Sequence, residues 1–154
     1  MEWSKGEYTI STDKERLDVP LVHEYLSTVA YWALGRPLDV VKRSIDNSVC
    51  FGIYLGTQQV GFTRVVTDHA TFAWLADVFI LPDHRGQGLS TWLLEVILAH
   101  PELQGLRRWL LATRDAHGLY KKFGFKPLLN PEKWMEIDTQ TATALPNLDS
   151  PIST

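Results

Sequence analysis

A short glycine-rich segment near the middle of the chain has the composition of a phosphate-binding loop. It runs from Arg85 to Ser90 with the sequence RGQGLS. Gly86 and Gly88 lack a Cβ, so a phosphate can approach main-chain N–H groups that a side chain would block. A helical apolar pattern begins at Leu89, and the loop therefore also presents the positive end of a helix dipole, to which Arg85 adds a charge. The segment predicts a site for a phosphate-containing ligand.

Two common phosphate-binding fingerprints do not fit this segment. The chain has no Gly-Lys-Ser/Thr for a triphosphate loop, and the third glycine of a dinucleotide-binding loop would fall on Thr91. The segment instead resembles the Arg/Gln-x-x-Gly-x-Gly/Ala loop of the Gcn5-related N-acetyltransferase (GNAT) family. Arg85, Gly88 and Ser90 stand at its three specified positions, with serine in place of the usual Gly or Ala.

A second motif of the same family follows at a plausible distance. The family signature Asn-x-x-Ala-x-x-Leu-Tyr-x-x-x-Gly-Phe is matched here from Thr113 to Phe125. Thr113 replaces the usual asparagine, which weakens the expectation of an amide contact to the pantetheine arm. The remaining matched positions are Ala116, Leu119, Tyr120, Gly124 and Phe125.

The resemblance implies an α/β (α+β) fold, with a mixed, mainly antiparallel sheet flanked by helices in one domain over residues 1–138. It implies acetyl-coenzyme A as acyl donor, bound where the strands at 71–81 and 107–112 splay apart, and a small-molecule amine or peptide as acceptor. The implied coenzyme-binding positions are the main chain of Val78, Phe79 and Ile80, the loop residues Arg85, Gly86, Gln87, Gly88, Leu89 and Ser90, and Thr113 and Tyr120.

Two ionisable residues are candidates for the proton transfers. Tyr120 stands at the motif position of the tyrosine that protonates the departing thiolate in the resembled family. The spacing of the apolar residues around it is also that of a core residue. Asp77 is the only ionisable residue between Thr71 and Leu81, and burial would raise its pKa toward that of a general base. Asp77 is interpreted either as the catalytic base or as a structural carboxylate at a strand bulge.

Other reactive side chains receive simpler interpretations. Tyr31 and Trp32 fall in the region that lines the acceptor pocket in the resembled family, and core packing is their alternative role. Cys50 lies in an apolar run and is interpreted as a buried thiol. The histidines lack metal-ligand spacing, so no metal site is expected, and His84 is expected either to contact phosphate or to be exposed.

Hydrophobic periodicity predicts the elements that position these residues. The strands separated by the turn at 56–58 and by the turn at 67–70 should form a three-stranded meander. The predicted strands are 8–11, 48–55, 59–66, 71–81, 107–112 and 134–137, and the predicted helices are 21–34, 40–45, one beginning at 89 and ending near Pro101, and one over 116–123.

Length, charge and hydropathy narrow the classes of protein to which the chain can belong. The 154 residues suit a single domain, and a net charge of −3 with scattered Lys and Arg argues against a nucleic-acid partner. No apolar run reaches the ~18 residues of a membrane helix and no signal-peptide pattern is present, so we expect no membrane partner and a cytoplasmic location. Residues 139–154 are expected to form a C-terminal tail. The sequence leaves the oligomeric state open, and a homodimer is one of the alternatives. It also leaves open two alternatives to acetyl transfer, namely a non-catalytic domain that senses acyl-coenzyme A and a transferase that uses a longer acyl donor.

Overall fold

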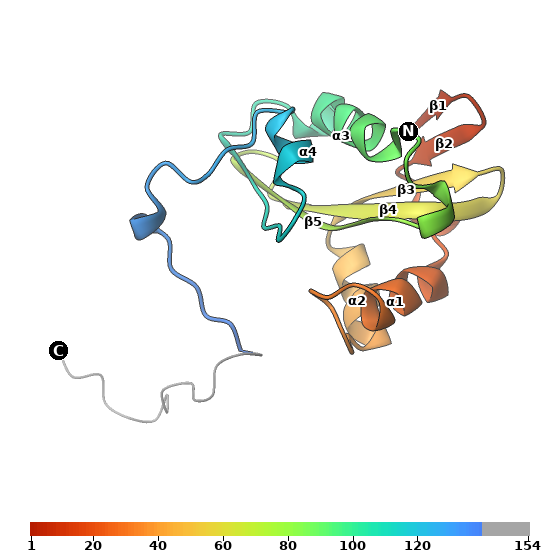
Figure 1. Ribbon diagram of the computed structural model, residues 1–154, viewed down its shortest axis with the longest axis horizontal. Helices are drawn as coiled ribbons and strands as arrows, with labels where there is room; N and C mark the ends of the chain where they lie inside the picture. The colour runs from red at the N-terminus through yellow and green to blue at the C-terminus, as the bar shows by residue number, and fades with distance from the viewer. Residues whose placement is uncertain (140–154) are drawn as a thin grey trace.

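A computed structural model describes residues 1–139 of the chain as one six-stranded sheet between two layers of helices (Figure 1). The strands are β1 (Glu2–Lys5), β2 (Tyr8–Ser11), β3 (Val49–Leu55), β4 (Gln58–Thr67), β5 (Phe72–Ile80) and β6 (Arg108–Leu110). The α-helices are α1 (Val19–Thr28), α2 (Leu38–Asp46), α3 (Leu89–Ala99) and α4 (His117–Lys121). None of these helices has the length and apolar character that crossing a bilayer requires.

The sheet is mixed and mainly antiparallel, as predicted. Its strands lie in the order β1 to β6, and every neighbouring pair is antiparallel except β5 and β6. The meander of β3, β4 and β5 is confirmed. The parallel pair is short, because β6 contacts only the first three residues of β5, Phe72 to Trp74. The rest of that edge of β5 is therefore free.

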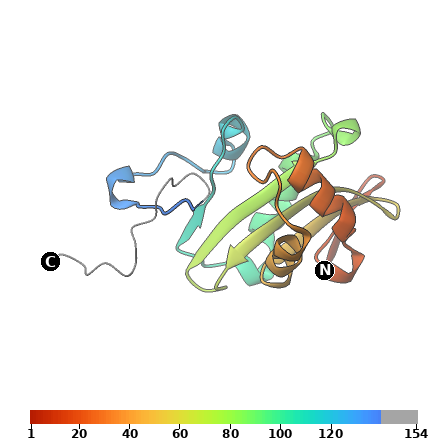
Figure 2. The same cartoon turned by 90° about the horizontal axis from the view of Figure 1, so that it is seen from below.

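Helices cover both faces of the sheet (Figure 2), and each face has its own apolar core. On one face, α1 and α2 cover Phe62 of β4 and Phe79 of β5. On the other face, α3 and the residues around α4 cover Phe51, Leu75 and their neighbours. As predicted, α3 begins at Leu89, with Gly88 as its N-cap residue, and it ends at Ala99, shortly before Pro101, because proline lacks the N–H that a continuing helix needs.

Three predictions about the helices and strands were wrong. A strand that the periodicity missed, β1, precedes β2 and pairs with it across a turn at Gly6. The first helix stops at Thr28 rather than at residue 34, so Tyr31 and Trp32 lie in a loop. Residues 134–137 are extended but pair with no strand of the described chain. Of the predicted tail, residues 140–154 lie outside the described residues.

Candidate active site

A bulge in β5 borders a cleft in the molecule. Arg64 of β4 pairs with Ala76 and Phe62 pairs with Phe79, so Asp77 and Val78 together face a single residue of β4. Asp77 adopts a φ of 55°, a left-handed conformation that is uncommon outside glycine. Because β6 leaves β5 before this point, a cleft of about 320 Å³ lies between the bulge and the segment that follows β6.

The cleft brings together residues that the sequence placed far apart. Tyr31 and Trp32 come from the loop after α1, Asp77 from the bulge, and Thr113 and Tyr120 from the segment after β6. All five line the same space, although 89 positions separate the first from the last. The predicted base, acid and acceptor-side residues therefore share one cavity.

Asp77 is held by three donors from two segments. Trp32 Nε1 donates to Oδ1 at 2.9 Å, while Arg36 Nη1 and Arg64 Nε donate to Oδ2 at 2.8 and 2.6 Å. The Asp77 side chain is only 2% exposed, and those of Arg36 and Arg64 are 21% and 16% exposed. We call these four residues the Asp77 cluster.

The Asp77 cluster reverses one expectation. Burial raises the pKa of Asp77, as predicted, but Arg64 and then Arg36 and Trp32 outweigh it, and the net pKa lies below the ordinary value of 3.8. The expected rise in the pKa of Asp77 was therefore wrong, because the sequence pattern did not reveal the two arginines. A carboxylate with a lowered pKa is a weaker base than a free one. The hydrogen bonds instead tie the loop after α1 to the bulge.

Tyr120 presents a protonated hydroxyl to the cleft. The residue is 8% exposed, and among residues 1–139 its hydroxyl has no hydrogen-bond partner while remaining open to the cleft. Burial raises the pKa of Tyr120, and Tyr31 and Asp115 act in the same direction. The phenol is therefore neutral at physiological pH and able to donate a proton.

The free edge of β5 exposes main-chain groups beside the bulge. Leu81 donates to the carbonyl of Val60 on β4 at 2.8 Å. Since successive strand residues point their backbone groups to opposite edges, Val78 and Ile80 point away from β4, toward the space that β6 leaves. The side chain of Phe79 meanwhile packs in the core. An extended ligand can therefore pair with this edge as an added strand, at Val78 and at the N–H of Ile80, whose carbonyl already accepts from Arg85.

The glycine-rich loop follows directly from that edge. Gly86 and Gly88 have φ values of 77° and 76°, which explains why both are glycine, and a Cβ on either would meet open space. Within the described chain, the amides from Gly86 to Thr91 donate no hydrogen bond. They surround a hollow of about 140 Å³ that Leu89 and Ser90 also line. The loop thus offers unpaired N–H groups at the start of α3.

Side chains on either side of the loop fix its position. Arg85 turns back, with Nε donating to the Ile80 carbonyl at 2.9 Å and Nη2 to the Tyr25 hydroxyl at 2.7 Å. His84 Nδ1 lies 3.0 Å from the Tyr8 hydroxyl, which also donates to Gln87 Oε1 at 3.2 Å. His84 is therefore neither a free surface residue nor a group aimed only at phosphate. Sequence patterns could not reveal Tyr8, which is 76 residues from its partner.

The far wall of the cleft is held by Thr113 and Tyr31. Thr113 Oγ1 accepts from the amide of Ala116 at 3.0 Å and so supports the start of α4, where the resembled motif has asparagine. The amide of Arg114 donates to the Tyr31 hydroxyl at 3.1 Å, and its guanidinium lies 3.7 Å from the centre of the Tyr31 ring. Tyr31 therefore joins the loop after α1 to the segment before α4, across the cleft.

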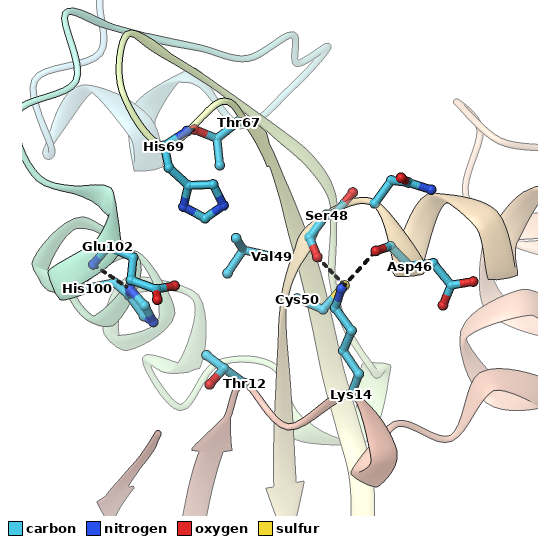
Figure 3. Close-up of a pocket in the computed structure, with 11 residues that line it drawn as sticks. Thr12, Lys14, Asp46, Ser48, Val49, Cys50, Thr67, His69, His100 and Glu102 are labelled. Atoms are coloured by element: carbon cyan, nitrogen blue, oxygen red, sulfur yellow. Dashed lines mark hydrogen bonds between the residues drawn. The ribbon is translucent and has the colours of Figure 1, made fainter.

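A second hollow lies where β3 begins and β4 ends (Figure 3). Its polar groups are largely bonded to one another: Lys14 Nζ donates to the Asp46 carbonyl at 3.1 Å, and His100 Nδ1 accepts from the Glu102 amide at 3.1 Å. Cys50 is buried there, as predicted, and burial raises its pKa to about 11, so the thiol is unreactive. Residues 1–139 contain no group of three or more His, Cys, Asp or Glu suited to a metal.

Known proteins resemble this chain in sequence and in structure. The family model described as "Acetyltransferase (GNAT) domain" matches residues 46–127. A Gibberella zeae protein named as an acetyltransferase is 36% identical in an alignment that covers 80% of this chain and 82% of the relative.

Two solved structures extend the comparison. A GNAT-family protein from Xanthomonas campestris pv. campestris is 50% identical with a TM-score of 0.85, covering 88% of this chain and 95% of that one. A Clostridium acetobutylicum protein solved with acetyl-coenzyme A is 15% identical with a TM-score of 0.63, over 89% of this chain and 98% of that one, and shows the shared fold alone.

Proposed function

Because the chain belongs to the GNAT acetyltransferase family, we propose that it transfers an acetyl group from acetyl-coenzyme A to a primary amine. The observation that carries the proposal is the order of three features along β5 and the loop that follows it. The Tyr120 hydroxyl lies in the cleft beside Val78, the free edge of β5 continues to Ile80, and the unpaired amides from Gly86 to Ser90 follow in the next hollow. A thioester, a pantetheine arm and a pyrophosphate occur in that order in acetyl-coenzyme A.

The proposed reaction is direct transfer. The unprotonated amine attacks the thioester carbonyl, a C–N bond forms, the C–S bond breaks, and the thiolate takes the proton of the Tyr120 hydroxyl. The phenolate then regains a proton from water. Tyr120 suits this role because its hydroxyl is protonated at neutral pH, has no hydrogen-bond partner among residues 1–139 and is open to the cleft. This hydroxyl favours an enzyme over an acyl-coenzyme A sensor, which has no use for an acid.

We assign Asp77 a positioning role rather than that of the base. Both of its oxygens already accept hydrogen bonds, and its pKa is lowered. The carboxylate holds Trp32 and Arg36 against the bulge, on the side of the cleft where an acceptor would lie. The amine proton then passes to water in the cleft. Arg85 is likewise a positioning residue, because it fixes the carbonyl of Ile80 at the start of the loop.

Coenzyme A should stabilise the protein measurably. A ligand held at 100 times its Kd adds about 2.7 kcal/mol to the free energy of unfolding, or roughly 5 to 10 °C in Tm for a domain of this size. Gly88→Val should abolish this shift, because the valine side chain would fill the open space at the loop and strain a φ of 76°. Thermal unfolding with and without saturating coenzyme A measures both effects.

Gly105→Val is the matched control for this experiment. Gly105 has a φ of 74° and equally open surroundings, but it lies after α3, away from the loop. Both variants should lose about 1–3 kcal/mol of stability from backbone strain, and only Gly88→Val should lose the response to coenzyme A. No shift in the parent protein, or an equal loss of response in both variants, would contradict binding at this loop.

Trp32→Ala should weaken the acceptor more than the coenzyme. Trp32 is 40% exposed in the cleft and donates to Asp77, so its removal opens the acceptor side and leaves the free edge of β5 unchanged. We expect the KM for the acceptor amine to rise on the order of tenfold, which corresponds to about 1.4 kcal/mol, with little change in the Kd for coenzyme A. Leu34→Ala, at a 61% exposed position of the same loop, is the control. An equal rise in the KM for the amine and in the Kd for coenzyme A would mean that Trp32 supports the fold rather than the acceptor site.

A further inference from the structure

The two arginines of the Asp77 cluster keep hydrogen-bond donors that the chain itself does not use. Arg36 commits Nη1 to Asp77, whereas Arg64 commits Nε to Asp77 and Nη1 to Ser48 Oγ at 3.3 Å. Among residues 1–139, no side-chain or main-chain oxygen bonds Arg36 Nε, Arg36 Nη2 or Arg64 Nη2. Tyr54 Oη is the one buried side-chain atom of those residues without a partner, so the three arginine nitrogens are open to solvent. Both arginines line the cleft, and a ligand bound there is within reach of these donors.

The Asp77 cluster carries more positive than negative charge. Two guanidinium groups face a single carboxylate, and within the described residues Asp77 is the only acidic side chain that pairs with either arginine. Asp115 also lines the cleft, but its side chain is 70% exposed and lies 3.9 Å from the guanidinium of Arg114. An excess charge on groups that are mostly buried is unfavourable unless an opposite charge reaches them. The cluster can therefore accept one more negative charge from a ligand.

Arg36 is held in place by contacts that need no ligand. Its amide donates to the Ala33 carbonyl at 3.0 Å, and its own carbonyl lies 3.1 Å from His23 Nε2 on α1. The bond from Nη1 to Asp77 fixes the guanidinium at the other end of the side chain. Donors that are already fixed bind a ligand without the entropic cost of ordering a free side chain. Arg36 is therefore preorganised to bind a ligand in the cleft.

The open donors lie close to the place where acetyl transfer would occur. Asp77, which both arginines bond, directly precedes Val78 on the free edge of β5. Tyr31, Trp32 and Trp74 line the same cleft and give it aromatic walls. An amine that attacks a thioester beside Val78 would therefore place its neighbouring atoms near these rings and near the arginines.

We propose that the acetyl acceptor is an amine that also carries a carboxylate, as a free amino acid does, and that Arg36 and Arg64 bind this carboxylate. The inference rests on the proposed function and specifies its acceptor. A planar guanidinium matches the two oxygens of a carboxylate, and charge-assisted hydrogen bonds of this kind are the strong ones. A carboxylate brings the single negative charge that balances the cluster, whereas a phosphate would bring about 1.5 to 2. An amine without an acid group leaves the excess charge of the arginines uncompensated, so these two residues determine specificity.

Matched acids and amides test the proposal on the parent chain. The probes are an α-, a β- and a γ-amino acid with an aromatic side chain, each paired with its own carboxamide. In assays of thiol release from acetyl-coenzyme A, kcat/KM for at least one acid should exceed that for its amide by about tenfold or more, the usual effect of hydrogen bonds to a charged group. Calorimetry on the complex with coenzyme A should show the N-acetylated acid binding about tenfold more tightly than the N-acetylated amide, and this measurement does not require transfer.

Arg36→Gln removes one positive charge and should abolish the preference for the acid. Asp77 keeps its bonds to Trp32 and Arg64 in this variant, and the cluster becomes neutral. The ratio of kcat/KM for the acid to that for the amide should therefore fall close to unity, and Arg36→Lys, which keeps the charge but loses the planar fork, should give an intermediate ratio. Arg43→Gln is the matched control and should keep the ratio of the parent, because Arg43 is exposed on α2 and does not line the cleft. A loss of folded protein affects both amines equally and leaves this ratio unchanged.

The outcomes separate the carboxylate site from acetyl transfer itself. Equal kcat/KM for every acid and its amide would overturn the carboxylate site even if acetyl transfer occurs, and so would a preference for the acid that Arg36→Gln leaves intact. Absence of transfer to every probe would contradict the proposed function, and the calorimetry alone would then decide on the site. Tighter binding of the acid by the parent but not by Arg36→Gln would support the site, whereas equal or absent binding of acid and amide would overturn it.

Discussion

Replacement of Tyr120 by phenylalanine should lower turnover by about 10²- to 10⁴-fold, the usual effect of losing one proton transfer, with little change in affinity for coenzyme A. The substitution removes only the hydroxyl, which has no hydrogen-bond partner among residues 1–139. The fold should therefore keep its stability. Steady-state rates and a coenzyme A titration of the same preparation measure the two effects separately.

Tyr54→Phe is the matched control for Tyr120. Tyr54, on β3, is also buried, and its hydroxyl lacks a partner among the residues that the structure describes. Its ring packs beneath the guanidinium of Arg16, outside the cleft. Burial raises the pKa of Tyr54 to about 12, so both phenols are protonated at neutral pH. Turnover in Tyr54→Phe should match the parent. Near-normal turnover in Tyr120→Phe would remove Tyr120 from the mechanism.

Asp77→Asn should cost on the order of 3 kcal/mol in the free energy of unfolding. The amide keeps the shape of the carboxylate but leaves Arg36 and Arg64 without a counter-charge, and breaking a buried ion pair typically costs this much. The exposed pair between Glu2 and Arg16 provides the control, since Glu2→Gln should change stability by less than about 1 kcal/mol. Denaturant unfolding at neutral pH compares the two variants.

The pH dependence of this difference has a definite sign. The folded state lowers the pKa of Asp77 below 3.8, so its stabilising effect is fully present above that value and is lost as pH falls toward the folded pKa. The parent and Asp77→Asn should therefore differ most at neutral pH and converge in acid. A difference that grows on acidification would contradict the lowered pKa.

The same variant separates positioning from base catalysis. If Asp77 only positions Trp32 and Arg36, the profile of kcat/KM against pH should keep its acidic limb in Asp77→Asn, because the amine itself sets that limb. The rate at the plateau should fall. Disappearance of the acidic limb, together with a lowered rate at the plateau, would establish Asp77 as the base.

The features that the sequence predicted are local ones. The glycine loop, the helix that follows it and the meander before it each depend on residues within about a dozen positions, where periodicity and turn chemistry are informative. The resemblance to the GNAT family added Thr113 and Tyr120, which the structure brings into one cleft with Asp77.

The features that the sequence missed depend on distant partners. Arg64 interrupts an apolar strand just as Asp77 does, and the meander sets them side by side; pairing the two isolated charges across the predicted turn would have revealed the low pKa. No local signal connects Tyr8 with His84. Residues 134–137 have the pattern of a strand, but a strand also needs a neighbour, and no strand of the described residues pairs with them.

Release of free thiol from acetyl-coenzyme A over a panel of small amines and amino-terminal peptides, with mass detection of the acceptor, tests the central claim most directly. The account predicts amine-dependent thiol release, an acceptor heavier by one acetyl group, and loss of both signals in Gly88→Val. Binding of acetyl-coenzyme A with no transfer to any amine of the panel, or transfer that is unaffected in Gly88→Val, would contradict it.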